Sequence, residues 1–240
     1  MNDGSPDNTE EVAKIWTSKD SRFKYLYKEN GGVASARNKG IDKALGSWVL
    51  PLDADDKIGD RYLELAVNEF DKGYTLVYCN AHYFKENYVE RWNLKKFNFE
   101  HLLLFNHIYC SAFFKKVDWE RIGGYDSNLI YGVEDWEFWI SLLNKNSNVK
   151  LIDYDGFFYR VKTNSRNTDF FRHSARKNNT DVYIYKKHLN KYLDYSENPI
   201  DNYREILKNY RDLNRINSEI RKNIITRILY KIIEIINHVF

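Results

Sequence analysis

The sequence predicts an α/β fold, a three-layer sandwich with a mainly parallel sheet, followed by a helical extension. Helix and strand patterns alternate over residues 1–80, which is typical of sheets whose strands are connected by helices. The short apolar run Trp48–Leu52 indicates a buried strand, and it ends on a group of acids. From about Arg166 the share of Asn, Lys and Tyr rises and the strand patterns stop. We therefore expect two domains, residues 1–165 and 166–240.

Local signals place the elements on either side of this strand. Thr9 can cap a short helix that has two acids in its first turn. Residues 23–27 are a candidate strand, and residues 33–45 have a helix pattern rich in small side chains. Asp60 begins a further helix, and residues 75–79 are the next candidate strand. This alternation is the basis of the predicted sheet.

The second half of the sequence is richer in helix patterns. Residues 134–143 predict a helix with acids in its first turn, and residues 149–152 and 156–161 predict short strands. Residues 223–240 are strongly amphipathic, with isoleucines every four residues on one face and mostly basic side chains on the other. We expect this last helix to lie in a membrane interface that contains anionic lipid. The alternative is that it packs on the protein's own core or on a second copy in a homodimer.

Composition and charge exclude several classes of function. A net charge of +3 gives no electrostatic argument for nucleic-acid binding. No apolar run is long and uncharged enough to cross a bilayer. Cys79 and Cys110 fit no metal-binding spacing and suit a reducing cytosol. We therefore expect a cytoplasmic protein, with a peripheral contact to the inner face of the cell membrane through residues 223–240.

The first candidates for a functional site are Asp53, Asp55 and Asp56. Three carboxylates this close together repel one another unless a positive charge lies among them. At the carboxyl end of a buried strand they could hold a hard divalent cation that phosphate oxygens also coordinate. The same residues also suit a surface turn with a helix cap, and on their own they leave both interpretations open.

Other motifs in the sequence favour the first interpretation. They occur in this order: Asn2-Asp3-Gly4-Ser5, Asn30-Gly31-Gly32 through Ala36-Arg37-Asn38-Lys39-Gly40, Leu52-Asp53-Ala54-Asp55-Asp56, Ile122-Gly123-Gly124-Tyr125-Asp126 and Glu134-Asp135-Trp136-Glu137, with a partial sixth at Tyr159-Arg160-Val161-Lys162-Thr163-Asn164-Ser165. In this order and spacing the sequence resembles the family 2 glycosyltransferases, which have the GT-A fold. The resemblance covers roughly residues 2–165 and favours a nucleotide-sugar site at the acid cluster.

The resemblance implies a metal-dependent, inverting transfer of a sugar from a nucleotide-diphosphate donor to a glycan or lipid-linked acceptor, in surface polysaccharide synthesis. Asp53 and Asp55 match the family's DXD motif, with Asp53 toward the ribose and both acids as candidate ligands of a Mn²⁺ or Mg²⁺ ion on the diphosphate. Asp3 would contact the base or ribose, or else cap the turn at Gly4-Ser5. Arg37 would lie near the nucleotide or the acid cluster, or else be a solvated helix residue.

The same resemblance implies roles at the start of the 134–143 helix. Asp135 matches the family's catalytic base, which takes the proton of the acceptor hydroxyl. Glu134 would bind the acceptor, although both acids also favour a helix N-terminus. We expect Trp136 in the core, and it is also the candidate for stacking on the acceptor sugar. Lys162 stands where many family members have His; a protonated lysine cannot ligate a metal, but it can neutralise diphosphate charge.

One part of the family pattern is absent from this sequence, namely the first strand and the helix that follows it. The resemblance therefore implies an N-terminally truncated GT-A-like domain whose sheet lacks a middle strand. For this reason there is an alternative function, a catalytically inactive glycosyltransferase-like domain that acts as a binding or partner module.

Overall fold

The computed structural model of the chain describes residues 1–163, 165–195, 204–205, 208–209, 211–219 and 222. The chain divides into two compact units, Met1–Leu189 and Asn190–Phe240, whereas the sequence analysis expected the division after residue 165. The first unit has the mixed α/β composition that the sequence predicted. The predicted amphipathic helix at residues 223–240 lies outside the described residues.

Six strands of the described residues form one sheet, in the order β1-β5-β3-β6-β2, with β4 paired to β3. The strands are β1 (Trp48–Val49), β2 (Lys57–Ile58), β3 (Leu76–Lys85), β4 (Tyr88–Trp92), β5 (Phe113–Lys115) and β6 (Val149–Arg160). Strands β3 and β6 are the long central pair, and the short strands flank them. The two short strands predicted at residues 149–161 are therefore one continuous strand, with irregular register opposite Cys79–Ala81.

The prediction of a mainly parallel sheet is wrong for the strands that the structure describes. Among their pairings only β3 with β6 is parallel, while β1–β5, β3–β5, β3–β4 and β2–β6 are antiparallel. Strand β4 returns along β3 after a two-residue turn, and so short a connection permits only antiparallel pairing. Residues 86–92 carry no strong strand pattern, so the sequence did not reveal this hairpin.

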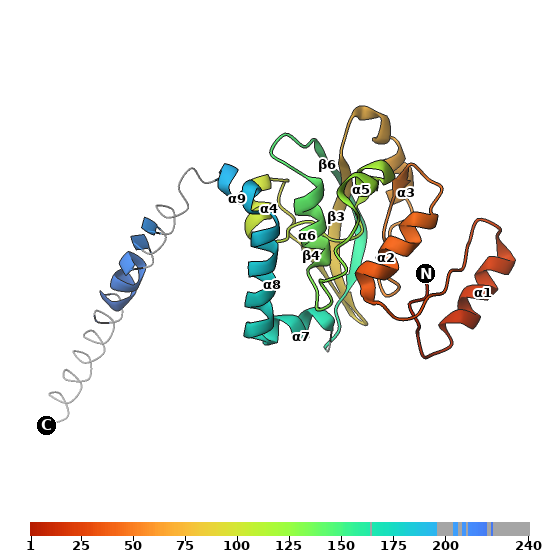
Figure 1. Ribbon diagram of the computed structural model, residues 1–240, viewed down its shortest axis with the longest axis horizontal. Helices are drawn as coiled ribbons and strands as arrows, with labels where there is room; N and C mark the ends of the chain where they lie inside the picture. Colours follow the sequence, from red (N-terminus) through yellow and green to blue (C-terminus); the bar gives the residue numbers. More distant parts are fainter. Residues whose placement is uncertain (164, 196–203, 206–207, 210, 220–221, 223–240) are drawn as a thin grey trace, which may run out of the picture. The chain divides into compact units, whose positions relative to one another are not determined.

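The helices complete the first unit and lead into the second. They are α1 (Thr9–Lys19), α2 (Gly32–Lys43), α3 (Tyr62–Val67), α4 (Phe99–Leu104), α5 (Lys116–Ile122), α6 (Glu134–Leu142), α7 (Arg166–Arg172), α8 (Ser174–Lys187) and α9 (Leu189–Tyr195), with a 3₁₀ turn η1 (Phe70–Lys72). Figure 1 shows α4, α6 and α8 on one side of β3 and β6, and α1 and α2 on the other. A helix that could span a bilayer is not found in the described part of the chain.

The strand predicted at residues 23–27 is not formed. Tyr27 makes a single parallel bridge with Asn2, and no ladder extends from it. Phe23 and Tyr27 remain about half exposed, so this segment lacks the buried face that stabilises a strand. The prediction came from β-propensity alone, which tertiary context overrides.

The core contains the central strand β3 and the helix α6. Leu76 to Cys79 are fully buried in β3, and Phe138 and Trp139 of α6 are fully buried and pack on Phe114 of β5. Phe138 stacks on Tyr125 with ring centroids 4.0 Å apart. Because α6 is anchored through these rings, its first turn, which carries Glu134 and Asp135, has a fixed position.

Candidate active site

The acid cluster follows β1, and the end of β6 holds it in place. The buried strand expected over Trp48–Leu52 is shorter than predicted, because β1 covers only Trp48–Val49 and Leu52 is exposed. Asp56 donates its backbone N–H to the carbonyl of Asp53 at 3.1 Å, which closes a tight turn. The backbone N–H of Arg160 donates to Asp56 Oδ1 at 2.8 Å, and Arg160 Nε donates to the carbonyl of Asp55 at 2.8 Å. These bonds cross about a hundred residues of sequence. They bring the partial motif around Arg160 and Lys162 next to the acids.

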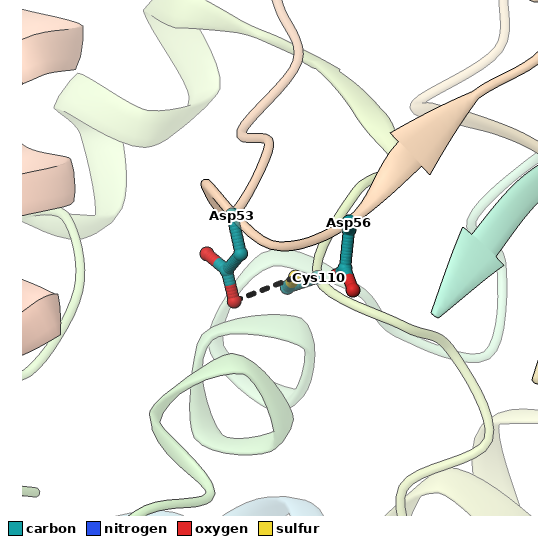
Figure 2. A group of neighbouring side chains, drawn as sticks. All are labelled: Asp53, Asp56 and Cys110. Carbon is teal, nitrogen blue, oxygen red and sulfur yellow. Dashed lines mark hydrogen bonds between the residues drawn. The ribbon is translucent and has the colours of Figure 1, made fainter. Parts of the chain in front are cut away.

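Within the cluster the three carboxylates separate into two groups. Asp53 and Asp56 converge with Cys110, and the three offer ligand atoms that all lie within 4.8 Å of one another (Figure 2). Asp55 instead pairs with Lys162, whose Nζ is 2.7 Å from Asp55 Oδ2. The sequence analysis named Asp53 and Asp55 as metal ligands. The structure brings Asp53 together with Asp56 and a thiol that sequence reasoning missed.

Cys110 enters this group from the loop before β5. Its thiol lies 3.8 Å from Asp53 Oδ2 and donates toward it. Burial raises the pKa of the Cys110 thiol well above its usual value, with the carboxylate of Asp53 acting in the same direction, so the group is protonated in the free protein. A single cysteine with no metal-binding spacing in sequence gave no signal of this position.

Asp56 carries the clearest sign that this site accepts a positive charge. Burial, together with the nearby charges of Asp53 and Asp55, raises its pKa to about 7, although the N–H of Arg160 opposes the shift. Its Oδ2 atom is buried and has no hydrogen-bond partner among the described residues. An unpaired, buried carboxylate oxygen beside two further acids is stabilised when a cation binds.

Arg37 of α2 connects the acid cluster to α6. Its Nη2 donates to both carboxylate oxygens of Asp53 at 2.8 and 3.0 Å, and its Nη1 donates to Glu134 Oε1 at 2.9 Å. The Arg37 side chain is only 8% exposed and that of Glu134 only 3%, so their ion pair is shielded from water, whereas the Asp53 side chain is partly exposed. The structure therefore places Arg37 beside the acid cluster, one of the two positions that the sequence analysis gave for it.

The start of α6 is held in a conformation that is unusual for its sequence. Gly132 has a φ of 138° and Val133 a φ of 57°. A β-branched residue in the left-handed region is strained, and such strain concentrates at functional sites. Directly after this turn comes Glu134, which is buried and bonded to Arg37 and also to Arg166 Nη2, at 3.0 and 3.2 Å. Arg166 is the first residue of α7, and the sequence analysis did not include it in the site.

Asp135 is the next residue, and its surroundings adjust its basicity. Asn106 Nδ2 donates to Asp135 Oδ2 at 3.1 Å, and the N–H of Trp136 donates to Oδ1 at 2.8 Å. Burial raises the pKa of Asp135 to about 6, the neighbouring Glu134 adds to the rise, and Arg37 opposes it. A carboxylate with this pKa is ionised at neutral pH and is a stronger base than an exposed aspartate, as general-base catalysis requires.

The remaining predicted residues, Asp3 and Trp136, are bonded to residues outside the acid cluster. Asp3 accepts from Lys28 Nζ at 2.7 Å and from the N–H of Gly31 at 3.1 Å, while Asn2, not Asp3, caps the adjacent turn through the N–H of Ser5. Trp136 is 9% exposed and its indole N–H donates to the carbonyl of Leu102, which agrees with a position in the core.

Comparisons with known proteins give both the fold and the family. The minor teichoic acid biosynthesis protein GgaB of Bacillus subtilis is 30% identical over 194 residues, 72% of this chain and 21% of the relative. Chondroitin synthase of Pasteurella multocida is 27% identical over 214 residues, 86% of this chain and 22% of that protein. The matched region is thus about a fifth of these curated relatives.

Solved structures show the same fold. The crystal structure of S. aureus TarS residues 1–349 in complex with UDP-GlcNAc matches with a TM-score of 0.58 and 16% identity, over 81% of this chain and 62% of that one. At this identity the match establishes a GT-A fold, as the sequence resemblance implied. The sequence model described as glycosyl transferase family 2 matches residues 1–134, more than half of the chain. The chain therefore belongs to glycosyl transferase family 2.

Proposed function

We propose that this chain is an inverting glycosyltransferase that moves a sugar from a nucleotide-diphosphate donor to an acceptor hydroxyl. The observation that carries the proposal is Asp135 at the first turn of α6, with a pKa raised to about 6 and a link through Glu134 and Arg37 to the acids after β1. Sugar transfer needs a base that activates a hydroxyl and positive charge that stabilises a leaving diphosphate. Asp135 can supply the base, and the acids after β1 can hold a cation. One buried arginine, Arg37, joins the two groups.

On the acceptor side, Asp135 accepts the proton of the attacking hydroxyl. Asn106 and the backbone of Trp136 donate to the two oxygens of Asp135 and fix the plane of the carboxylate. A single base that activates the acceptor for in-line attack opposite the leaving group gives inversion at the anomeric carbon. Glu134, held by two arginines, is the proposed contact to a further hydroxyl of the acceptor.

On the donor side, Asp53, Arg37, Lys162 and Asp3 are the proposed contacts to the nucleotide. A Mn²⁺ or Mg²⁺ ion would be held by Asp53 with Asp56 or Asp55, and the buried, unpartnered oxygen of Asp56 fits such an ion. Bound there, the ion would supply positive charge to the departing diphosphate. Lys162, half exposed beside Asp55, adds a second positive charge to the same region.

The relatives support a wider setting for this activity. Their names place them in teichoic acid biosynthesis and chondroitin synthesis, so we propose surface polysaccharide assembly for this chain, with a glycan or lipid-linked acceptor. We propose the same location as the sequence suggested, in the cytoplasm at the inner face of the cell membrane.

The test is the variant Asp135→Asn, assayed for transfer with a panel of nucleotide sugars and for donor binding by calorimetry. Losing a general base should lower turnover by about a hundredfold to ten-thousandfold, while donor affinity stays near that of the wild type. Asp153→Asn is the matched control, because Asp153 is an exposed acid on β6 that contacts Asn80 and none of the site residues above.

Wild-type turnover in Asp135→Asn would show that another group is the base. If the wild-type protein binds donors without any transfer, the result favours the alternative function, an inactive domain that binds a ligand or partner.

A further inference from the structure

A charged cluster joins the end of α8 to Glu137 of α6. Glu137, one residue beyond Trp136, is fully buried, and its Oε1 atom accepts from Ser141 Oγ at 2.7 Å. Two residues at the end of α8 contact the same oxygen, Lys187 Nζ at 2.9 Å and His188 Nε2 at 2.7 Å. Figure 1 shows α6 and α8 on the same side of the sheet, with their lengths roughly aligned.

Lys187 also reaches a second acid, so it holds two segments at once. Its Nζ lies 2.6 Å from Asp126 Oδ2, and Tyr183 of α8 donates to the same oxygen at 2.7 Å. Asp126 ends the Gly123-Gly124-Tyr125-Asp126 motif. The preceding Tyr125 is bonded through its backbone to Asn38, beside Arg37. Lys187 therefore links the motif turn to α6 through ion pairs with Asp126 and Glu137. The buried rings of Tyr125 and Phe138 link the same two segments by stacking.

The electrostatics of the cluster show that α8 is needed to keep Glu137 charged. Burial alone would raise the pKa of Glu137, but hydrogen bonds from His188, Lys187 and Ser141 bring it below the usual value. A fully buried carboxylate that loses these partners is unfavourable and either takes up a proton or moves toward water. Movement of Glu137 toward water would displace the first turns of α6.

A third contact acts on the strained turn before α6. Arg176 of α8 lies over the ring of Tyr131, with its guanidinium carbon 4.4 Å from the ring centroid, and Asp169 of α7 holds the same arginine at 2.8 Å. Tyr131 directly precedes Gly132 and Val133, whose left-handed backbone positions Glu134 and Asp135. Residues of α8 therefore contact Tyr131, before Glu134 and Asp135 in sequence, and Glu137, after them.

We propose that α8 is a clamp on α6, and that Lys187 and Glu137 are positioning residues of the transfer reaction, which act through Asp135. The inference rests on the proposed function of Asp135. It assigns a role to residues beyond the 1–134 region that the family comparison covers. The clamp fixes the angle at which Asp135 meets the acceptor hydroxyl, and displacements of about 1 Å at such a group can lower the rate about a hundredfold.

The experiment compares Lys187→Met with Lys187→Arg and with a matched control, Lys177→Met. Lys177 is on the same helix, but its ion pair is with Asp181 of α8 and not with α6. For each protein, turnover and the KM for donor are measured at saturating acceptor, and amide hydrogen exchange is followed over the whole chain. Glu137→Gln, combined with Lys187→Met, is the second variant, because it removes the fully buried charge of Glu137 together with its cation if the single variant fails to fold.

We expect Lys187→Met to lower kcat about tenfold to a hundredfold, with the donor KM within about threefold of the wild type. Exchange should become faster in residues 124–138 and remain unchanged in β3 and β6. Lys187→Arg should restore most of the activity, since arginine can span the same two acids, and Lys177→Met should behave as the wild type.

The inference is overturned if Lys187→Met and the double variant both keep wild-type kcat and wild-type exchange. It is also overturned if kcat and donor affinity fall together while exchange rises throughout the chain, because that result indicates a general loss of stability. If the wild-type protein transfers no sugar, the proposed function fails, while the exchange of residues 124–138 still decides whether α8 holds α6.

Discussion

Replacing Arg37 by methionine should change the pH dependence of catalysis as well as its rate. Burial and Glu134 raise the pKa of Asp135, and Arg37 is the positive group that opposes this rise. Methionine keeps much of the volume of the side chain and removes the charge. The variant therefore separates the electrostatic role of Arg37 from its packing.

The size of the effect follows from the pKa of Asp135, about 6 in the intact site. A base with this pKa is about 90% ionised at pH 7 and about 10% ionised at pH 5, so kcat should fall about tenfold between these values. A neighbouring opposite charge lowers a carboxylate pKa by about one to three units. Without Arg37, the pH at which kcat rises should therefore move from about 6 to about 7 or above.

Stability will fall in the same variant, and this must be measured separately. Removing one partner of a buried ion pair costs about 3–5 kcal/mol. Here Glu134 keeps Arg166, and the Asp53 side chain is 36% exposed, so we expect about 2–3 kcal/mol. A domain of ordinary stability tolerates that loss.

The assay is kcat at saturating donor and acceptor from pH 5 to 9, together with denaturant unfolding at pH 7. Arg121→Met is the matched control, because Arg121 pairs with Asp118 on the surface and its loss should cost under about 1 kcal/mol and leave the profile unchanged. Glu134→Gln should move the limb in the opposite direction, to lower pH, since it removes the like charge beside Asp135. A folded Arg37→Met protein whose limb stays at the wild-type position would refute this reasoning.

Two further outcomes follow from the same contacts. One outcome concerns which acid completes the cation site with Asp53. If it is Asp56, calorimetry should show that Asp56→Ala removes the Mn²⁺ dependence of nucleoside-diphosphate binding and that Asp55→Ala only weakens it. The reverse pattern would assign the ion to Asp53 and Asp55, the pair named from the sequence. Although burial opposes the shift, Lys187 and Tyr183 hold the pKa of Asp126 at about 2, so its contribution to stability is complete above about pH 5 and is lost as the pH falls through 2. Asp126→Asn should therefore cost about 1 kcal/mol at pH 7 and almost nothing below about pH 2, a difference that acid unfolding curves would reveal or exclude. The value is small because Lys187 is a third exposed.

The sequence by itself determined the elements whose signals are local. The apolar run at Trp48 begins with a strand, although β1 covers only Trp48–Val49 of it, and Glu134 and Asp135 open a helix whose apolar side chains are buried. Such features depend on side-chain periodicity and on helix-end preferences, which act within a few residues and can be read without the fold. The order of motifs added the GT-A fold, which the comparisons confirm.

The failures of prediction also have physical causes. Residues 23–27 have the composition of a strand but no neighbour to pair with beyond the Asn2 bridge. The direction of the strands was misjudged because pairing is a property of two segments, and neither segment alone records its partner.

Only the tertiary structure decided which charged groups meet. Cys110 reaches Asp53 across 57 residues, Arg166 reaches Glu134 across 32, and Lys187 reaches Asp126 across 61. No periodicity links such positions, because the path of the chain through β3, β5 and β6 brings them together. The free energy of each pair then depends on the burial of its surroundings, which exists only once that path is folded.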